Sequence, residues 1–407
     1  MPTGSPSTSP ADGRTILLAA QSGRALAAAA RRAGFAPLVA DLFGDADTRA
    51  LAAAYRRLQG RFGFGLGEGS VLAALESLAR SAAIPPLGVV LGSGFERRPD
   101  LVATIDRRFG VIGASAEAIG ALKDPAAFAD LLRRLGAPHP PVSLGPVPNP
   151  SAWLRKARGG SGGGHIRLGR AGPPPRGTYL QARVEGAPRS LAFLADGRKA
   201  RVLAATEQWA TPSVRAPFRY GGAVEPGTLP LSVREEAAAA LCGIVEATGL
   251  RGLASADLLV DGERWWLLEV NPRPGATLDC LDRRRTPLLL RHVAASGGDL
   301  GPNEPVPAMA SGTAIVYAAR TIPRVPPLAW PDFAVDRPGE GARVRAGAPI
   351  CTVAATAGTA AAVKRLLTER AAAVIALLGG EEAHDAAIGP IGRSACRPTR
   401  QRAETWG

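Results

Sequence analysis

Short apolar runs alternate with helical segments over the first 115 residues of the chain. Residues 15–20 and 35–40 have the length and composition of buried strands. The alanine-rich stretch between them ends at Gly34, a residue typical of helix C-termini. A helix over 70–81 and strands near 87–91 and 110–112 continue the alternation. The pattern predicts an open α/β domain over residues 14–115, with the loops at the carboxyl ends of its strands facing a ligand.

The pattern then changes from helical to β-rich. Asp124 and Pro125 have the residue types of a helix N-cap and first helical position, and the glycine at 136 should end that helix. From Trp153 onward the chain is rich in strand formers and glycine. Ser232 and Glu235 form a capping box that predicts a long helix as far as residue 249, followed by a hairpin around residue 262.

A third region begins after residue 302. It contains an apolar run over 314–318, a proline-rich stretch, a glycine-punctuated β segment over 339–353 and a helix over 360–378. Residues 381–407 have the composition of a polar tail, and residues 1–13 that of a disordered leader.

Composition narrows the class of protein. The 407 residues are 46% hydrophobic, which is enough for two or three packed domains. No apolar run approaches the ~20 residues that span a bilayer, and residues 1–13 lack the features of a signal peptide. The four cysteines are widely spaced, which argues against a disulfide framework or a structural zinc site. We therefore expect a cytoplasmic protein with no membrane partner.

The formal net charge of +14 at pH 7 has two interpretations. An anionic partner would explain it. The mutational bias of a GC-rich genome would also explain it, because only four of the 49 basic residues are lysine. The arginines are scattered and no aromatic platform is interleaved with them, so a nucleic-acid partner is not expected.

The apolar strand over residues 265–270 carries oxygen donors at its end. Glu269 and Asn271 are two residues apart and should point to the same face of the strand. A three-residue hairpin loop over 262–264 would bring Asp257 opposite Glu269. Three oxygen ligands on one face suit Mg²⁺, with phosphates and water completing its coordination. A strand end that simply meets solvent is the alternative, but the joint spacing favours a metal–phosphate site. Arg273 follows the strand and can hold an anionic oxygen through two hydrogen bonds.

A glycine-rich segment follows Lys156. Five of the six residues 159–164 are glycine, which excludes a helix or strand interior. The segment is either a mobile loop whose N–H groups close over phosphates or a plain surface linker. Lys156 can reach a phosphate as a point charge. His165 is either a polar loop residue or a direct contact to phosphate or substrate.

Residues 179–186, Tyr-Leu-Gln-Ala-Arg-Val-Glu-Gly, predict a short strand that runs into a turn. The backbone of such a segment can bind an adenine ring, which needs one N–H and one C=O at a fixed spacing.

The order of these motifs resembles that of the ATP-grasp superfamily over about residues 110–300. The order is a lysine with a glycine-rich loop, then Q-x-x-V-E-G, and then an acid followed by E-V-N-P-R. The spacing from Asp257 to Glu269 resembles that of the biotin carboxylase branch. The resemblance implies an α/β ATP-grasp fold. It would have a Rossmann-like pre-ATP-grasp domain (14–115), an ATP-grasp domain (116–300) with an α+β lid at about 150–186, and a C-terminal β-rich region (301–380).

The same resemblance implies site residues. Asp257, Glu269 and Asn271 would hold two Mg²⁺ ions, for which Mn²⁺ can substitute, and Arg273 and His165 would be catalytic. The residues that would contact ATP are Lys123, Lys156, Gly160, Ser161, Gly162, Gly163, Gly164, Gln181, Ala182, Val184 and, near the ribose, Arg189.

A narrower likeness involves residues 18–24, 41–45 and 349–353. They are similar to segments of the ATP-grasp proteins of methylotrophic bacteria, which are linked to tetrahydromethanopterin and methanofuran C1 metabolism and are similar to tyramine–glutamate ligase.

The expected reaction is ligation of a carboxylate to an amine through an acyl-phosphate, with small-molecule substrates and, as in many relatives, a homodimer. The alternatives are a bicarbonate-activating carboxylase-type enzyme, although no Met-Lys-Met sequence for biotin attachment is present, and a non-catalytic ATP-binding subunit.

Residues 21–24 follow the first strand and open the first helix. Ser22 and Arg24 are therefore candidate ligands for the substrate carboxylate, because a helix N-terminus at a strand end suits an anion. A simple helix cap by Ser22, with Arg24 in solvent, is the alternative.

Overall fold

The computed structural model describes residues 13–63 and 65–379. The predicted leader up to residue 12 and the predicted tail over 381–407 lie outside the described residues.

The N-terminal part is built around a five-stranded parallel sheet in the order β3-β2-β1-β6-β7. The apolar runs become its central strands because the inner strands of a parallel sheet are buried on both faces. The strand near residues 54–57 and the helix over 99–109 had not been predicted. The elements of this part are β1 (Thr15–Ala19), α1 (Arg24–Arg32), β2 (Ala36–Asp41), α2 (Ala46–Leu51), β3 (Ala54–Arg57), β4 (Gly60–Arg61), β5 (Gly65–Leu66), α3 (Glu68–Ser81), β6 (Val89–Leu91), α4 (Pro99–Phe109) and β7 (Val111–Ile112).

Two helices lead from this sheet to a small antiparallel sheet. They are α5 (Ala116–Lys123) and α6 (Pro125–Arg134), and the side chain of Asp124 accepts hydrogen bonds from the N–H groups of Ala126 and Ala127, which confirms the predicted cap. The small sheet, which we call the lid sheet, has the order β10-β9-β11-β8. Its elements are β8 (Val142–Ser143), the short 3-10 turn η1 (Pro150–Ala152), β9 (Trp153–Ala157), β10 (Arg167–Leu168) and β11 (Thr178–Ala182).

The centre of the molecule is an eight-stranded antiparallel sheet in the order β16-β15-β12-β13-β14-β17-β19-β18. The C-terminal β-rich region is therefore continuous with the central sheet. The central elements are β12 (Ala187–Asp196), β13 (Ala200–Ala210), β14 (Tyr220–Glu225), α7 (Leu231–Thr248), β15 (Arg251–Asp261), β16 (Arg264–Asn271), α8 (Leu278–Leu281) and α9 (Leu288–Ser296). The C-terminal ones are β17 (Ala310–Tyr317), β18 (Ala334–Val335), β19 (Pro349–Ala357) and α10 (Ala360–Leu377).

The long helix α7 begins two residues earlier than the capping box predicted. The capping box was wrong, because Pro230 is the N-cap and the hydroxyl of Ser232 bonds to Glu263 of the neighbouring hairpin instead. Gly249 ends the helix in the left-handed conformation, with φ 66°, as its sequence position indicated.

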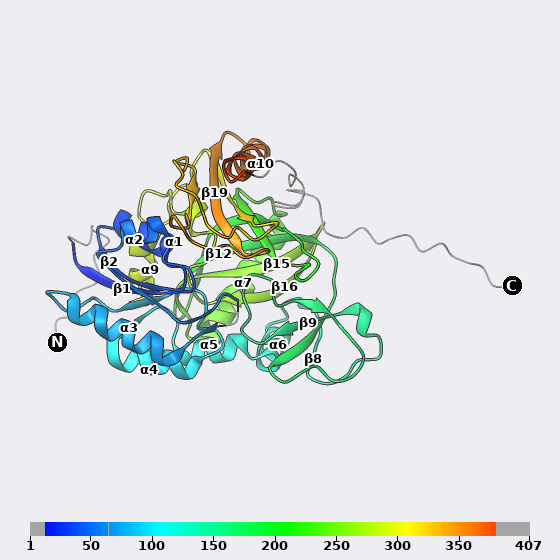
Figure 1. Ribbon diagram of the computed structural model, residues 1–407. Coiled ribbons are helices and arrows are strands. Elements are labelled where there is room, and N and C mark those ends of the chain that lie inside the picture. Colours follow the sequence, from blue (N-terminus) through cyan, green and yellow to red (C-terminus); the bar gives the residue numbers. More distant parts are fainter. Residues whose placement is uncertain (1–12, 64, 380–407) are drawn as a thin grey trace, which may run out of the picture.

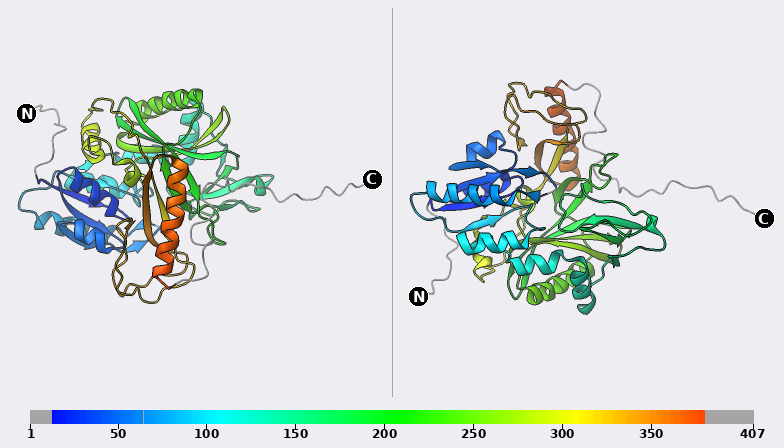
Figure 2. Two further views of the ribbon diagram at one scale, coloured as in Figure 1. Left: turned by 90° about the horizontal axis from the view of Figure 1, so that it is seen from above. Right: turned by 60° about the horizontal axis from the view of Figure 1, so that its bottom comes forward.

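The two faces of the central sheet are covered by different helices. Alternate β12 residues divide between two cores: Leu191 and Phe193 pack with α7, whereas Ala192 and Leu194 pack with α1 and α9. Figure 1 shows the central sheet between the parallel sheet and the lid sheet, with α10 at the opposite end of the molecule from the lid. The two views of Figure 2 show α10 lying along the C-terminal strands. The site residues below lie where the parallel, lid and central sheets meet.

Candidate active site

The hairpin of β15 and β16 places Asp257 directly opposite Glu269. This confirms the predicted pairing, but the predicted three-residue loop was wrong. Asp261 pairs with Arg264 across a two-residue turn, and a β-bulge between Asp257 and Leu258 shifts the register by one residue. Without the bulge, Asp257 would face Leu268, and Glu269 would point to the other face.

Asp257 and Asn271 are held together. The amide of Asn271 donates to Oδ2 of Asp257 over 3.1 Å, and the hydroxyl of Ser190 on β12 donates to Oδ1 over 2.8 Å. These bonds fix the orientation of the carboxylate, as outer partners do around metal ligands. Ser190 had not been predicted, since nothing near it in the sequence marks it as a partner of Asp257.

Lys123 joins this group from the last residue of α5. Its Nζ lies 3.4 Å from Oε2 of Glu269 and 3.1 Å from Oδ1 of Asn271, and its side chain is 7% exposed. The structure therefore brings Lys123 to the predicted metal ligands, although it lies on a helix rather than on a strand. A buried ammonium at this place favours an anionic ligand beside the carboxylates.

The two carboxyl groups have different electrostatic surroundings. Burial and the adjacent charge of Glu269 raise the pKa of Asp257. Burial also acts to raise the pKa of Glu269, but the charges of Lys123 and Lys156 outweigh it and hold the pKa below its usual range. Paired acids whose pKa values move apart are typical of functional sites.

Gln181 lines a cleft between the lid sheet, α6 and β16, and Lys156 is bonded to it. Nζ of Lys156 bonds to Oε1 of Gln181 over 3.0 Å, and Nε2 of Gln181 contacts the carbonyl oxygen of Leu268 over 3.4 Å. Lys123, Glu269 and His165 also line the cleft, whose volume of about 510 Å³ includes the open solvent at its entrance. Its walls combine apolar side chains with a few convergent polar groups, as in small-molecule sites.

His165 is held at the end of the glycine-rich loop. Its Nδ1 accepts the N–H of Ala157 over 3.2 Å, so Nε2 carries the proton of the neutral ring. Burial lowers its pKa to about 4. A β-carbon on Gly160 would lie 2.4 Å from the imidazole ring, which explains the glycine there. His165 is thus a neutral hydrogen-bond donor in the cleft near pH 7.

The loop over 159–164 is packed against two other parts of the chain. A β-carbon on Gly159 would lie 2.6 Å from the carbonyl oxygen of Glu96, and one on Gly163 would lie 1.8 Å from that of Phe218. The carbonyl oxygen of Gly162 accepts the N–H of Tyr220 on β14 over 2.9 Å. Ser161 and Gly164 belong to the same loop. The glycines therefore permit a close approach to both neighbouring segments.

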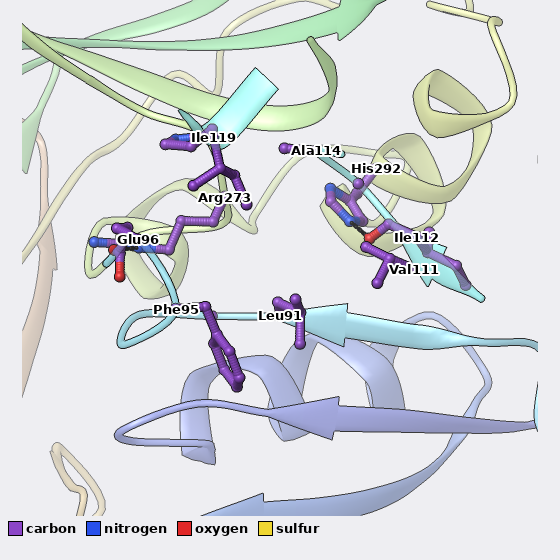
Figure 3. Close-up of a pocket in the computed structure, with 12 residues that line it drawn as sticks. Leu91, Phe95, Glu96, Val111, Ile112, Ala114, Ile119, Arg273 and His292 are labelled. Atoms are coloured by element: carbon purple, nitrogen blue, oxygen red, sulfur yellow. Dashed lines mark hydrogen bonds and ion pairs between the residues drawn. The ribbon is translucent and has the colours of Figure 1, made fainter. Parts of the chain in front are cut away.

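Arg273 forms a buried ion pair that the sequence did not reveal. Its Nε donates to Oε1 of Glu96 over 2.6 Å, and Figure 3 shows the two side chains meeting beside the loop that follows β6. Burial acts to raise the pKa of Glu96, but the charges of Arg273 and Lys123 together with the hydrogen bonds to the carboxylate outweigh it and lower the pKa. Glu96 lies at the carboxyl edge of the parallel sheet, which is the signal that could have identified it.

His292, in the same view, has a structural environment. Its Nε2 contacts the carbonyl oxygen of Ile112 over 2.9 Å and its Nδ1 accepts the N–H of Leu253 over 2.8 Å, so both ring nitrogens are satisfied.

The structure contradicts the prediction that Ser22 and Arg24 receive a substrate carboxylate. Arg24 is 4% exposed, and its guanidinium is shared by Asp279 and Asp336, with Nε of Arg24 3.0 Å from Oδ1 of Asp336. The hydroxyl of Ser22 also points to Asp336, at 3.5 Å, and makes no helix cap. The chain's own carboxylates therefore fill the place that was expected for the substrate.

Of the eleven predicted nucleotide contacts, Lys123, Gly160 and Gln181 line the cleft. The other eight do not: Lys156, Ser161, Gly162, Gly163, Gly164, Ala182, Val184 and Arg189. Arg189 lies on the face of β12 opposite Ser190, where its Nε donates to the carbonyl oxygen of Thr228, because successive strand residues alternate between faces. The N–H of Ala182 is already bonded to the carbonyl oxygen of Pro141.

The residues fit a magnesium site that is completed by phosphate. No group of three or more His, Cys, Asp or Glu side chains within residues 13–63 and 65–379 could hold a metal ion by itself. Two carboxylates and one amide oxygen, however, are the partial set with which Mg²⁺ binds a nucleotide. The orientation of Asp257 by Ser190 and Asn271 supports this fit.

The domain comparison agrees with this geometry. Residues 123–277 match the model of an ATP-grasp domain. No curated protein sequence matches the chain significantly.

Several solved structures share the fold. One is the biotin carboxylase domain of 2-oxoglutarate carboxylase from Hydrogenobacter thermophilus, in complex with MgADP, ADP and bicarbonate (TM-score 0.67, 14% identity, 92% of this chain and 96% of that chain). Another is N5-carboxyaminoimidazole synthetase from Staphylococcus aureus complexed with ADP (0.62, 12%, 88% and 97%). A third is phosphoribosylamine–glycine ligase from Thermotoga maritima (0.62, 15%, 88% and 96%). At these identities the likeness establishes the fold.

No helix in the described part of the chain is both long enough and apolar enough to cross a membrane.

Proposed function

We propose that this chain, which carries an ATP-grasp domain in an ATP-grasp fold, is an ATP-dependent ligase that joins a carboxylic acid to an amine through an acyl-phosphate. The observation that carries this proposal is the pairing of Asp257 with Glu269, with Asn271 and Lys123 beside them, next to a cleft that Glu269 and Lys123 line.

The proposed roles follow from these positions. Glu269, Asp257 and Asn271 hold the metal–nucleotide, and a bound Mg²⁺ supplies neutralisation of charge on the phosphates. Lys123 and Lys156 offset the remaining phosphate charge. His165 donates a hydrogen bond to an oxygen in the cleft. Closure of residues 159–164 excludes water, which would otherwise hydrolyse the acyl-phosphate.

Arg273 is the proposed anchor for the acid, since Arg24 is already paired. Its Nε is held by Glu96, which fixes the plane of the guanidinium. A fixed planar cation beside the metal site suits a carboxylate that must approach the terminal phosphate.

A bicarbonate-activating reaction is the second candidate. It is favoured by the same geometry and by similarity in fold to the biotin carboxylase domain crystallised with bicarbonate. The two reactions differ in whether an organic acid or bicarbonate alone supports ADP release.

The finer proposals concern biological context. The likeness of residues 18–24, 41–45 and 349–353 to methylotroph proteins supports a role in the synthesis of a C1 carrier such as methanofuran or tetrahydromethanopterin. The proposal also includes two Mg²⁺ ions, which Mn²⁺ can replace. It further includes assembly as a homodimer and a cytoplasmic location.

ADP release tests the proposed function. Purified protein with MgATP is assayed against a panel of acids and amines, with glutamate and tyramine-like amines first and bicarbonate in a separate arm. ADP release that requires both an acid and an amine is expected. Release with bicarbonate alone would favour the carboxylase-type reaction, and nucleotide binding without release would favour a binding subunit.

Glu269→Gln tests the site itself. It removes an anionic ligand without changing the shape of the side chain, and ADP release should fall by about 100-fold or more. Asp261→Asn on the same hairpin is the control. Asp261 forms an exposed ion pair with Arg264, so its substitution should leave turnover within about twofold. Near-normal turnover of Glu269→Gln would refute the metal assignment.

A further inference from the structure

The hydroxyl of Tyr220 is buried and has no hydrogen-bond partner among the residues that the structure describes. The backbone of the same residue is fixed on both sides. Its N–H donates to the carbonyl oxygen of Gly162, and its carbonyl oxygen accepts the hydroxyl of Tyr317 over 2.8 Å. A buried hydroxyl without a hydrogen-bond partner costs free energy, so a bound ligand that supplies an acceptor would be stabilised there.

The register of the central sheet places Tyr220 on the face that carries Asp257. Asp257 pairs with Ser190, and Ser190 pairs with Thr206. Side chains at alternate positions share a face, so Ala210 on β13 faces the same way as Thr206. Tyr220 pairs with Ala210, beyond the irregularity at Trp209. The phenol ring therefore projects into the space that the metal ligands border.

The glycine-rich loop fixes the position of Tyr220 from the other side. Gly162 bonds to its N–H, and Gly163 packs against the carbonyl oxygen of Phe218 just before it. If this loop covers phosphates beside Asp257, the Tyr220 hydroxyl lies at the edge of the same anionic group.

The hydroxyl keeps its proton and is available as a hydrogen-bond donor. Burial, with the nearby Cys280, Asp257 and Asp279, raises the pKa of Tyr220 well above its ordinary value. The phenol is therefore protonated near neutral pH and is not a general base there.

We propose that the Tyr220 hydroxyl donates a hydrogen bond to the phosphoryl group that is transferred beside Asp257. The proposal rests on the proposed function. In the transfer, the bond from the terminal phosphorus to the oxygen of ADP breaks, and a bond to a carboxylate oxygen of the acid forms. Tyr220 neither gains nor loses a proton. It stabilises the charge on the terminal phosphoryl oxygens, which ADP lacks.

Tyr220→Phe in the full chain tests this role by binding. The probes are MgADP and the Mg²⁺ complex of the β,γ-imido analogue of ATP, titrated calorimetrically. Loss of one hydrogen bond to a charged oxygen should weaken the imido analogue about tenfold, and MgADP should change by less than about twofold. The unliganded variant should unfold at the same temperature as wild type or higher, because its ring is retained and only an unpartnered hydroxyl is lost.

Tyr317→Phe is the matched control. It removes a hydroxyl that is already bonded to Tyr220, so it should lower the unfolding temperature and leave the ratio of the two affinities unchanged.

Equal weakening of both nucleotides by Tyr220→Phe, or no weakening, would overturn the role of Tyr220 alone. A lower unfolding temperature of that variant would also overturn it, because the hydroxyl would then have a partner within the chain. Failure of wild type to bind either nucleotide would overturn the proposed function and this inference with it.

Discussion

Asp45 is a buried carboxyl group placed among others of its own charge. It is 9% exposed and makes no side-chain cap for α2, although it occupies the N-cap. Burial and the charges of Asp336, Asp41 and Asp47 raise its pKa to about 8. A raised pKa means that the folded chain holds this proton more tightly than the unfolded chain. Its contribution to stability is therefore complete below about pH 4 and is lost as pH rises through about 8.

Asp45→Asn should consequently stabilise the protein at high pH. We expect the free energy of unfolding to rise by at least about 1 kcal/mol at pH 8 and to change little at pH 4, because asparagine has nearly the same shape without the charge. Denaturant unfolding at the two pH values measures this. Exposed Asp130→Asn should show no such pH dependence, and an Asp45→Asn variant destabilised at pH 8 would contradict the electrostatic account.

At the same scale, the sequence predicted those site residues that lie close together along one hairpin. Asp257, Glu269 and Asn271 were found because strand alternation is a local rule. Glu96 and Ser190 were not found, because each meets its partner only through tertiary packing.

At the scale of elements, two glycines of the glycine-rich loop have the same backbone conformation but different surroundings. Substituting each one distinguishes the effect of backbone strain from that of a steric clash. Gly162 and Gly163 both have φ +68°, but a β-carbon at 162 meets nothing within 4 Å, whereas one at 163 meets Phe218. Gly162→Ala should therefore cost only about 1 kcal/mol of backbone strain. Gly163→Ala should also push the loop off β14, increase proteolysis within 159–164 and weaken MgATP binding. Limited proteolysis with and without MgATP distinguishes them, and identical cleavage of the two variants would show that the loop is a plain linker.

Element predictions succeeded where the signal was local and failed where a distant partner decided the outcome. Asp124 caps α6 because the N–H groups that donate to its carboxylate follow directly in the chain. The predicted capping box at Ser232 was wrong because its hydroxyl donates a hydrogen bond to Glu263 on the adjacent hairpin.

At the scale of the whole molecule, Arg24 connects three regions. From α1 it pairs with Asp279 on α8 and with Asp336 beyond β18, which are 255 and 312 residues away in sequence. Asp336 has φ 57° and is the one non-glycine residue with positive φ among residues 13–63 and 65–379, so tertiary contacts hold it in an unfavourable conformation. Because these two aspartates are so far from Arg24 in the sequence, the sequence did not reveal the internal ion pair and indicated a substrate ligand instead.

Arg24→Met should destabilise the protein by about 3–5 kcal/mol, because it leaves two part-buried carboxylates without their cation. Denaturant unfolding measures the loss, and hydrogen exchange should increase in α1 and around residue 336. Exposed Arg31→Met on the same helix should cost less than about 1 kcal/mol. A stable Arg24→Met variant with a raised KM for the acid would restore the substrate role that the sequence suggested.

The bulge beside Asp257 also bears on how related chains would be aligned. Twelve positions separate Asp257 from Glu269 whether the hairpin has a three-residue turn and regular strands or a two-residue turn and a bulge. Two homologues could therefore align here without a gap and still differ in turn type. An insertion in the turn could be compensated by loss of the bulge, so the length of this turn can vary in evolution while the two acids stay paired.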